Sequence, residues 1–216
     1  MTDLRKLFFE AGRSGWIASL LLVLAGGCNS SGTPAVSQAS VDETAASAAA
    51  MEQYDKNHDG SLDREELVAC APLAAALATF DANNDSKLSA EETSAGIAKL
   101  FGSSSALATF NGTVTLSGRP LSGARVRFVP ASFLGEGLTA AEGVTDESGA
   151  FRPALADAEL PKNLQGQPLI RPGLYLVEIT HSEQQIPAKY NTATELGAVV
   201  DPTSRTGLAS RFDLQP

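Results

Sequence analysis

Three patterns of apolar and polar positions follow one another along this chain. A short, largely apolar run lies near the start, from Trp16 to Ala25. Alanine-rich stretches with helically spaced apolar residues occupy 41–101, and beyond them stretches such as "GTVTL", "ARVRFV" and "GLYLVEIT" alternate apolar and polar residues between glycine and proline turns. The second pattern predicts helices and the third predicts short antiparallel strands, so the expected fold class is a multidomain α plus β protein.

Three helices are predicted in the helical region. Met51 and Tyr54, three residues apart in an alanine-rich stretch, indicate a helix that begins near Val41. A second helix is expected from Pro72 to Phe80, because proline is tolerated in the first turn of a helix. A third helix is expected from about Ala90 to Phe101.

The first apolar run belongs to a secretory signal pattern. Basic residues precede it, and small residues follow it in "LAGGC", which ends at Cys28. The run is about half of the ~20 residues that a helix needs to cross a bilayer, so a permanent transmembrane helix is the weaker interpretation. "LAGGC" resembles the lipobox of bacterial lipoproteins, although Ala25 stands where leucine is more frequent. The resemblance implies that Cys28 is lipid-modified; a non-lipidated signal and a short anchor are the alternatives.

The segments between these patterns are rich in small residues. Ser, Gly, Ala and Pro dominate the stretch after Cys28, which predicts a flexible tether, and "GSSS" from Gly102 marks a linker. The predicted organisation is a signal segment with the lipobox cysteine at 1–28, a tether at 29–40, the helical region at 41–101, a linker at 102–107 and a β domain at 108–216.

A lipidated Cys28 would anchor the protein to a membrane of the cell envelope, facing the periplasm or the exterior. Asn29 follows it, in place of the aspartate associated with inner-membrane retention in enteric bacteria, so the outer membrane is expected. Cys70 then has no cysteine partner, and its alanine- and leucine-rich surroundings favour a small buried hydrophobe over a reactive thiol. The net charge of -9 argues against nucleic acid as a partner and is compatible with cation binding.

The stretch "DKNHDGSLDREE" resembles the calcium-binding loop of EF-hand proteins. Calcium takes oxygen ligands, and a chain wrapped tightly around the ion presents alternate side chains to it. Gly60 at loop position 6 permits the positive φ of the sharp turn, and His58 at position 4 is expected to point outward. The candidate ligands are Asp55, Asn57, Asp59, Ser61 through its backbone carbonyl, Asp63 and Glu66.

A second loop, "DANNDSKLSAEE", repeats the first after a step of 26 residues. Leu88 repeats Leu62 at position 8, where EF-hand loops pair through a short β-bridge. Ser86 stands where glycine is usual, which should cost on the order of 1 kcal/mol if it adopts the left-handed conformation. The first loop is expected to bind calcium more tightly, because it has four carboxylates and the second has three with a lysine nearby. The second set of candidate ligands is Asp81, Asn83, Asp85, Lys87 through its backbone carbonyl, Ser89 and Glu92.

Two other kinds of structure share features with these loops. Dockerin modules also carry closely spaced calcium loops, but they usually close with aspartate, whereas Glu66 and Glu92 close both loops here. The second alternative to calcium-binding loops is a pair of solvated acidic loops between helices. The 14 residues between the loops require short intervening helices. Calcium outside the cytoplasm is near millimolar, so even weak sites would stay occupied, which favours a structural pair over a signalling pair.

The alternation in the remaining half of the chain predicts that Val126 and Phe128 face the core and that Arg125 and Arg127 face solvent. This half also carries a family resemblance, in the residues Gly112, Val114, Leu116, Gly118, Pro120, Leu121, Gly123, Ala124, Val126, Phe128, Pro130, Thr145, Asp146, Gly149, Phe151, Pro172, Gly173, Tyr175, Val177, Ile186, Pro187, Lys189 and Tyr190. It resembles the transthyretin-like, carboxypeptidase regulatory-like family, in the version that ends many planctomycete lipoproteins. That resemblance implies a Greek-key antiparallel β-sandwich of roughly seven strands without an active site of its own.

Catalysis is not expected, because the two histidines, His58 and His181, suggest neither a Ser-His-Asp set nor a zinc site. The leading hypothesis is a non-enzymatic envelope lipoprotein that binds calcium through an EF-hand pair and carries a structural or adhesive β-sandwich. Its expected partners are calcium, a membrane through the lipid anchor, and an envelope protein or polysaccharide, with no role for nucleic acid. The alternative is a calcium-responsive sensor that captures a partner through the EF-hand pair.

Overall fold

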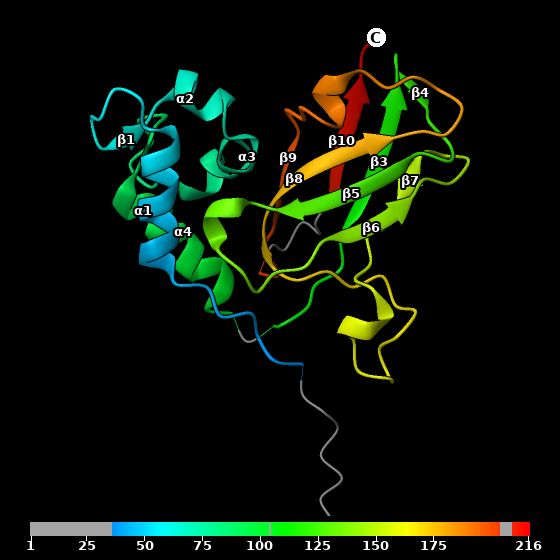
Figure 1. Cartoon of the computed structure of the whole chain (residues 1–216), viewed down its shortest axis with the longest axis horizontal. Coiled ribbons are helices and arrows are strands. Elements are labelled where there is room, and N and C mark those ends of the chain that lie inside the picture. Colours follow the sequence, from blue (N-terminus) through cyan, green and yellow to red (C-terminus); the bar gives the residue numbers. More distant parts are fainter. Residues whose placement is uncertain (1–35, 104, 204–208) are drawn as a thin grey trace, which may run out of the picture. The chain divides into compact units, whose positions relative to one another are not determined.

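The computed structural model describes residues 36–103, 105–203 and 209–216 of the chain. The signal segment, Cys28 and most of the predicted tether lie outside the described residues. The described part combines helices at its start with β-sheets after them (Figure 1), which confirms the α plus β class. No helix in this part of the chain has the length and apolarity needed to cross a membrane.

The helical region contains the three predicted helices and one short helix between the loops. Asp42 caps the first helix by accepting a hydrogen bond from the Ala45 N–H at 2.9 Å. Pro72 lies in the first turn of the third, where its missing N–H leaves no bond unmade. The helices are α1 (Glu43–Tyr54), α2 (Arg64–Val68), α3 (Ala71–Phe80) and α4 (Ala90–Phe101), and the loops contribute β1 (Ser61–Leu62) and β2 (Leu88–Ser89).

The β domain is built from two sheets and three short 3₁₀ helices (Figure 1). One sheet has the order β10-β3-β4, with β7 also paired to β3, and the other has the order β6-β5-β8-β9. The strands are β3 (Asn111–Leu116), β4 (Arg119–Pro120), β5 (Arg125–Pro130), β6 (Ala141–Val144), β7 (Ala150–Phe151), β8 (Gly173–Thr180), β9 (Gly197–Val200) and β10 (Ala209–Leu214), and the 3₁₀ helices are η1 (Ser132–Leu134), η2 (Asp157–Glu159) and η3 (Ala188–Tyr190).

One strand pair differs from the antiparallel prediction. β10 runs parallel to β3, with Phe212 opposite Val114, whereas the other strand pairs are antiparallel. Antiparallel neighbours are often joined by tight hairpins, but β3 and β10 are the first and last strands of the domain and have no hairpin between them. Alternation of side chains does not reveal strand direction, so the sequence pattern could not have distinguished the two cases.

The two sheets share one apolar core. Phe128 of β5 contacts the rings of Phe110 and Tyr175, with centroids 4.9 and 5.8 Å apart. Phe151 covers Gly112 so closely that a β-carbon there would overlap the ring, which explains the glycine. On the outer face, Arg127 forms ion pairs with Glu142 and Glu178, as the predicted alternation requires.

A second apolar core joins the helices to the β domain. Leu73, Ile97 and Leu100 from the helices lie in the same buried cluster as Phe133 of η1 and Leu174 of β8. The backbones also touch, because a β-carbon at Gly197 of β9 would overlap the carbonyl oxygen of Ala71. This cluster contains residues from both sides of the predicted linker at 102–107. The described residues belong to one compact unit. The helical region is therefore packed against the sheet that contains β8 and β9.

Candidate metal centre

The first loop begins where α1 ends and closes where α2 begins. The Asp55 N–H donates to the Met51 carbonyl at 2.9 Å and so terminates α1. Asp63 caps α2 through hydrogen bonds from the N–H groups of Glu65 and Glu66, at 2.8 and 3.1 Å, and Glu66 accepts in return from the Asp63 N–H at 3.0 Å. The predicted ligands at positions 9 and 12 thus form a capping box that starts the helix.

The other ligand positions of the first loop face inward and accept backbone hydrogen bonds. The Asp55 carboxylate accepts from the N–H groups of Asp59 and Gly60, at 3.2 and 3.0 Å. The Asn57 side-chain oxygen accepts from Asp59 N–H at 2.8 Å, and Glu66 Oε1 accepts from the N–H groups of Lys56 and Asn57 at 2.8 and 3.2 Å. Asp55 and Glu66 are buried, although both are acidic.

The second loop repeats most of this network at the equivalent positions. The Asp81 carboxylate accepts from the N–H groups of Asp85 and Ser86, at 3.2 and 2.9 Å, in place of the bonds of Asp55. The Asn83 side-chain oxygen accepts from Asp85 N–H at 2.8 Å. Glu92 accepts from the N–H groups of Ala82, Asn83 and Ser89, and with Ser89 it forms the capping box of α4. The six candidate positions therefore occupy equivalent places in both loops.

The turn at position 6 is left-handed in both loops. Gly60 has φ 85° and Ser86 has φ 65°, so the serine adopts the conformation that the template requires. His58 and Asn84 at position 4 are left-handed as well, with φ 59° and 60°, and both side chains are exposed. The histidine therefore points outward as predicted.

The loops pair with each other through β1 and β2. Leu62 lies opposite Leu88 and Ser61 lies opposite Ser89 in an antiparallel bridge. Both leucines are fully buried. The bridge predicted from the repeated apolar position is confirmed.

Both loops fit a calcium ion by the chemistry of their donors. Each offers carboxylates, an amide oxygen and a backbone carbonyl, which are the hard oxygen ligands that calcium takes. A carboxylate oxygen that accepts one N–H keeps a second lone pair for a metal. Within the described ranges no three His, Cys, Asp or Glu side chains are gathered as a preformed metal cluster.

One charged contact crosses between the loops. The Lys87 ammonium of the second loop lies 3.3 Å from Asp59 Oδ2 of the first. Hydrogen bonds from Ser61, and then the ammonium of Lys87, lower the pKa of Asp59. Asp59, with smaller contributions from Asp63 and Asp85, raises the pKa of Lys87. The sequence predicted Lys87 near the second loop only, because spacing along the chain does not show that a side chain reaches a different loop.

Cys70 lies fully buried at the N-cap of α3. Burial raises the pKa of its thiol to about 11, and burial together with Cys70 raises the pKa of the neighbouring Tyr54 to about 12. Cys70 is therefore the small buried hydrophobe that the sequence predicted.

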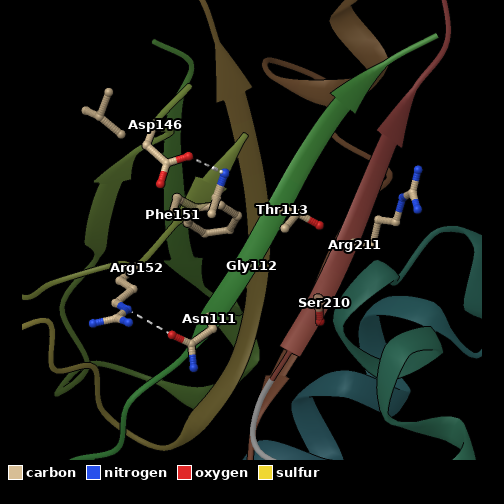
Figure 2. A pocket seen from close by; sticks show the side chains of 10 residues that line it. Asn111, Gly112, Thr113, Asp146, Phe151, Arg152, Ser210 and Arg211 are labelled. Carbon is tan, nitrogen blue, oxygen red and sulfur yellow. Dashed lines mark hydrogen bonds between the residues drawn. The ribbon is translucent and has the colours of Figure 1, made fainter. Parts of the chain in front are cut away.

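The β domain carries a groove of about 610 Å³ over β3, β7 and β10 (Figure 2). Arg152 lies along one side, where its Nε donates to the Asn111 side-chain oxygen at 2.9 Å. Asp146 Oδ1 accepts from the N–H groups of Ser148 and Ala150 and from the Ser148 hydroxyl, which lowers the pKa of Asp146. The carboxylate is thus held by the backbone of the turn at 146–149.

Lys189 and Tyr190, two of the residues that carry the family resemblance, lie in η3. Tyr190 is buried, and its hydroxyl accepts a hydrogen bond from the Gln215 N–H at 2.9 Å. The Lys189 ammonium lies 5.0 Å from the centre of the Tyr190 ring. Packing is therefore their role in η3.

Comparisons with known proteins give a family match at the first loop. A family model described as EF hand matches residues 48–71, which include the end of α1, the first loop and α2. A search of curated proteins gives no match. Among solved structures, a DUF3823 family protein from Parabacteroides merdae matches with a TM-score of 0.30 and 13% identity, over 50% of this chain and 45% of that one. The chain thus spans less than half the length of that protein. The EF-hand match indicates calcium binding.

Proposed function

We propose that this protein is a calcium-binding, non-enzymatic lipoprotein of the cell envelope, in which the EF-hand pair stabilises the fold and the β domain is a structural or adhesive module. The observation that carries the proposal is the repeated network of ligand-position hydrogen bonds in two loops joined by a buried bridge. A solvated acidic loop has no reason to repeat such a network. Calcium would be held by the twelve candidate positions of the two loops.

A structural role is favoured over a sensor role by what covers the helices. Sensor EF-hand pairs open on calcium binding and expose an apolar groove to a partner. Here Ile97 and Leu100 of α4 share a buried cluster with Phe133, Leu134 and Leu174 of the same chain. A sensor would have to separate these contacts before it captured a partner.

Calorimetric titration of the full chain tests calcium binding directly. We expect binding in the wild type and a large loss of affinity in the variant Glu66→Gln, because the closing glutamate supplies two oxygens to the ion. Calcium at 100 times its Kd should also stabilise the fold by about 2.7 kcal/mol, which raises the unfolding temperature. A wild-type chain that neither binds calcium nor gains stability from it would refute the proposal.

A hydrophobic dye separates the structural pair from the sensor. We expect the fluorescence of the dye to stay unchanged when calcium is added, because the apolar face is already covered. The exposed Val68, which is 72% accessible, sets a background that is equal in both states. A marked rise in dye binding with calcium would favour the sensor.

Lipidation is tested at the cysteine of the predicted lipobox. We expect the wild-type protein to incorporate labelled fatty acid and to sediment with membranes. The variant Cys28→Ser should not incorporate the label, since the thiol is the acceptor for the lipid. Labelling that persists in the variant would refute the anchor and leave the calcium sites unaffected.

A further inference from the structure

The side chain of Lys87, in the second loop, contacts Asp59, a candidate ligand of the first loop. Its ammonium is 3.3 Å from Asp59 Oδ2, while Asp59 Oδ1 accepts hydrogen bonds from the N–H and the hydroxyl of Ser61, at 3.0 and 2.8 Å. Both carboxylate oxygens of loop position 5 are therefore engaged in the first loop. A calcium ion in that loop needs one of these oxygens.

The equivalent carboxylate of the second loop has no such cation. Asp85 Oδ1 accepts from the Lys87 N–H at 2.8 Å and Oδ2 accepts from the Asn83 side-chain amide at 3.0 Å, and within the described residues Asp85 makes no ion pair. The residue of the first loop that corresponds to Lys87 is Ser61, which is neutral. The ion pair is thus one-sided, because it engages the position-5 carboxylate of the first loop and has no counterpart in the described residues of the second.

We infer that Lys87 acts as a built-in competitor of calcium: its ammonium pairs with Asp59 in the metal-free chain, and its positive charge opposes binding of the ion by the first loop. The inference rests on the proposed calcium binding. It also reduces the expected difference in calcium affinity between the two loops, because the lysine weakens calcium binding by the first loop, which has more carboxylates. The ammonium and the carboxylate are 41% and 40% exposed, so water screens the pair and the effect is modest.

The variant Lys87→Gln isolates this effect. Position 7 binds calcium through its backbone carbonyl, so the substitution removes the charge and keeps the ligand. The background variant Glu92→Gln disables the second loop and leaves the first for calorimetric titration. In low salt we expect Lys87→Gln to tighten binding about two- to fivefold, as for an exposed ion pair. The gain should fade in about 1 M KCl, where the Debye length is ~3 Å.

Lys56→Gln is the matched control. It removes the same charge from the first loop, but the Lys56 ammonium donates to the Gln53 carbonyl at 2.6 Å and not to a ligand. We expect it to change affinity less than Lys87→Gln, and Lys87→Arg to keep the wild-type affinity. Equal gains from both glutamine variants, or no gain from Lys87→Gln, would overturn the inference while wild-type binding stands. No calcium binding by the wild type would refute the proposed function instead.

A second measurement does not depend on calcium. In chelator, the ammonium neutralises part of the charge of the two acidic loops. Lys87→Gln should therefore lower the unfolding temperature of the metal-free chain in low salt, and added KCl should reduce the loss. An unchanged unfolding temperature in chelator would show that the lysine does not take the place of the ion.

Discussion

Ser86 is the residue that most clearly separates the two loops. It adopts φ 65° where Gly60 adopts φ 85°, and a serine is strained in this region whereas a glycine is not. Its N–H still donates to Asp81 at 2.9 Å, so the loop keeps its hydrogen bonds. The serine therefore changes the energy of the second loop and leaves its geometry intact.

Exchange of the two turn residues should move stability in opposite directions. Ser86→Gly is expected to raise the free energy of unfolding of the metal-free chain by about 1 kcal/mol, because Ser86 already adopts φ 65° without an ion and glycine adopts this conformation without strain. Gly60→Ser should lower the free energy of unfolding by a similar amount. Urea unfolding in chelator measures both. Equal stability of Ser86→Gly and the wild type would show that the serine is not strained.

Calorimetric titration with calcium should distinguish the two closing glutamates, Glu66 and Glu92. Glu66 and Asp55 of the first loop are buried, whereas Glu92 and Asp81 are partly exposed. We therefore expect Glu66→Gln to lose more calcium affinity than Glu92→Gln. Glutamine keeps the capping box in either case, so the helices should remain. A larger loss in Glu92→Gln would reverse the predicted order of the sites.

Cys70 should be unreactive in the folded chain. Its pKa is raised from 9.0 to about 11, so at pH 8 the thiolate is roughly a hundredfold scarcer than in the unfolded chain. Alkylation by iodoacetamide should be slower by at least that factor until urea unfolds the protein. The folded state holds the proton more tightly, so the stability contributed by this group is full below about pH 9 and falls as the pH rises toward 11. Rapid alkylation at pH 8 without urea would contradict the buried position.

The bridge between β1 and β2 makes the two loops one unit. Leu62 and Leu88 face each other and are fully buried. A structural change in one loop is therefore expected to change the structure of the other. The helices around them start at residues that are also candidate ligands, because Asp63 with Glu66 and Ser89 with Glu92 form capping boxes. The same residues therefore set the helix boundaries and the metal chemistry.

Truncation of the bridge should disrupt both loops. Leu88→Ala is expected to lower the free energy of unfolding by about 2–5 kcal/mol, as buried leucines do, and to weaken calcium binding by the first loop as well as the second. Val68→Ala is the matched control, because Val68 is 72% exposed. Urea unfolding and titration measure the two effects. A loss of affinity confined to the second loop would show that the bridge does not couple them.

The buried cluster between helices and sheet should carry the effect of calcium into the β domain. Leu174 of β8 and Phe133 of η1 lie in the cluster with the helices. Calcium is therefore expected to slow hydrogen exchange in β8 as well as in the loops, and Phe133→Ala should reduce this slowing in β8. Mass spectrometry of peptides from β8 measures it. Protection confined to residues 43–101 would show that the two regions are independent.

Local patterns were sufficient for much of this molecule. The helix ends near Tyr54, Phe80 and Phe101, the loop positions and the inward face of Val126 and Phe128 all follow from neighbours a few residues apart. Spacing determines these features because backbone hydrogen bonds and the periods of helices and strands are local.

Contacts between distant segments were decided only by the tertiary structure. The parallel pairing of β10 with β3, the packing of α3 against Gly197 and the reach of Lys87 to Asp59 each join residues whose partners no local pattern names. Such contacts depend on how whole elements pack, and apolar and charged side chains can pair with many partners of the same kind. The sequence by itself determined two EF-hand-like loops, their helices and a β domain after them, and the tertiary structure decided that these parts share a core and that the second loop places a cation on the first.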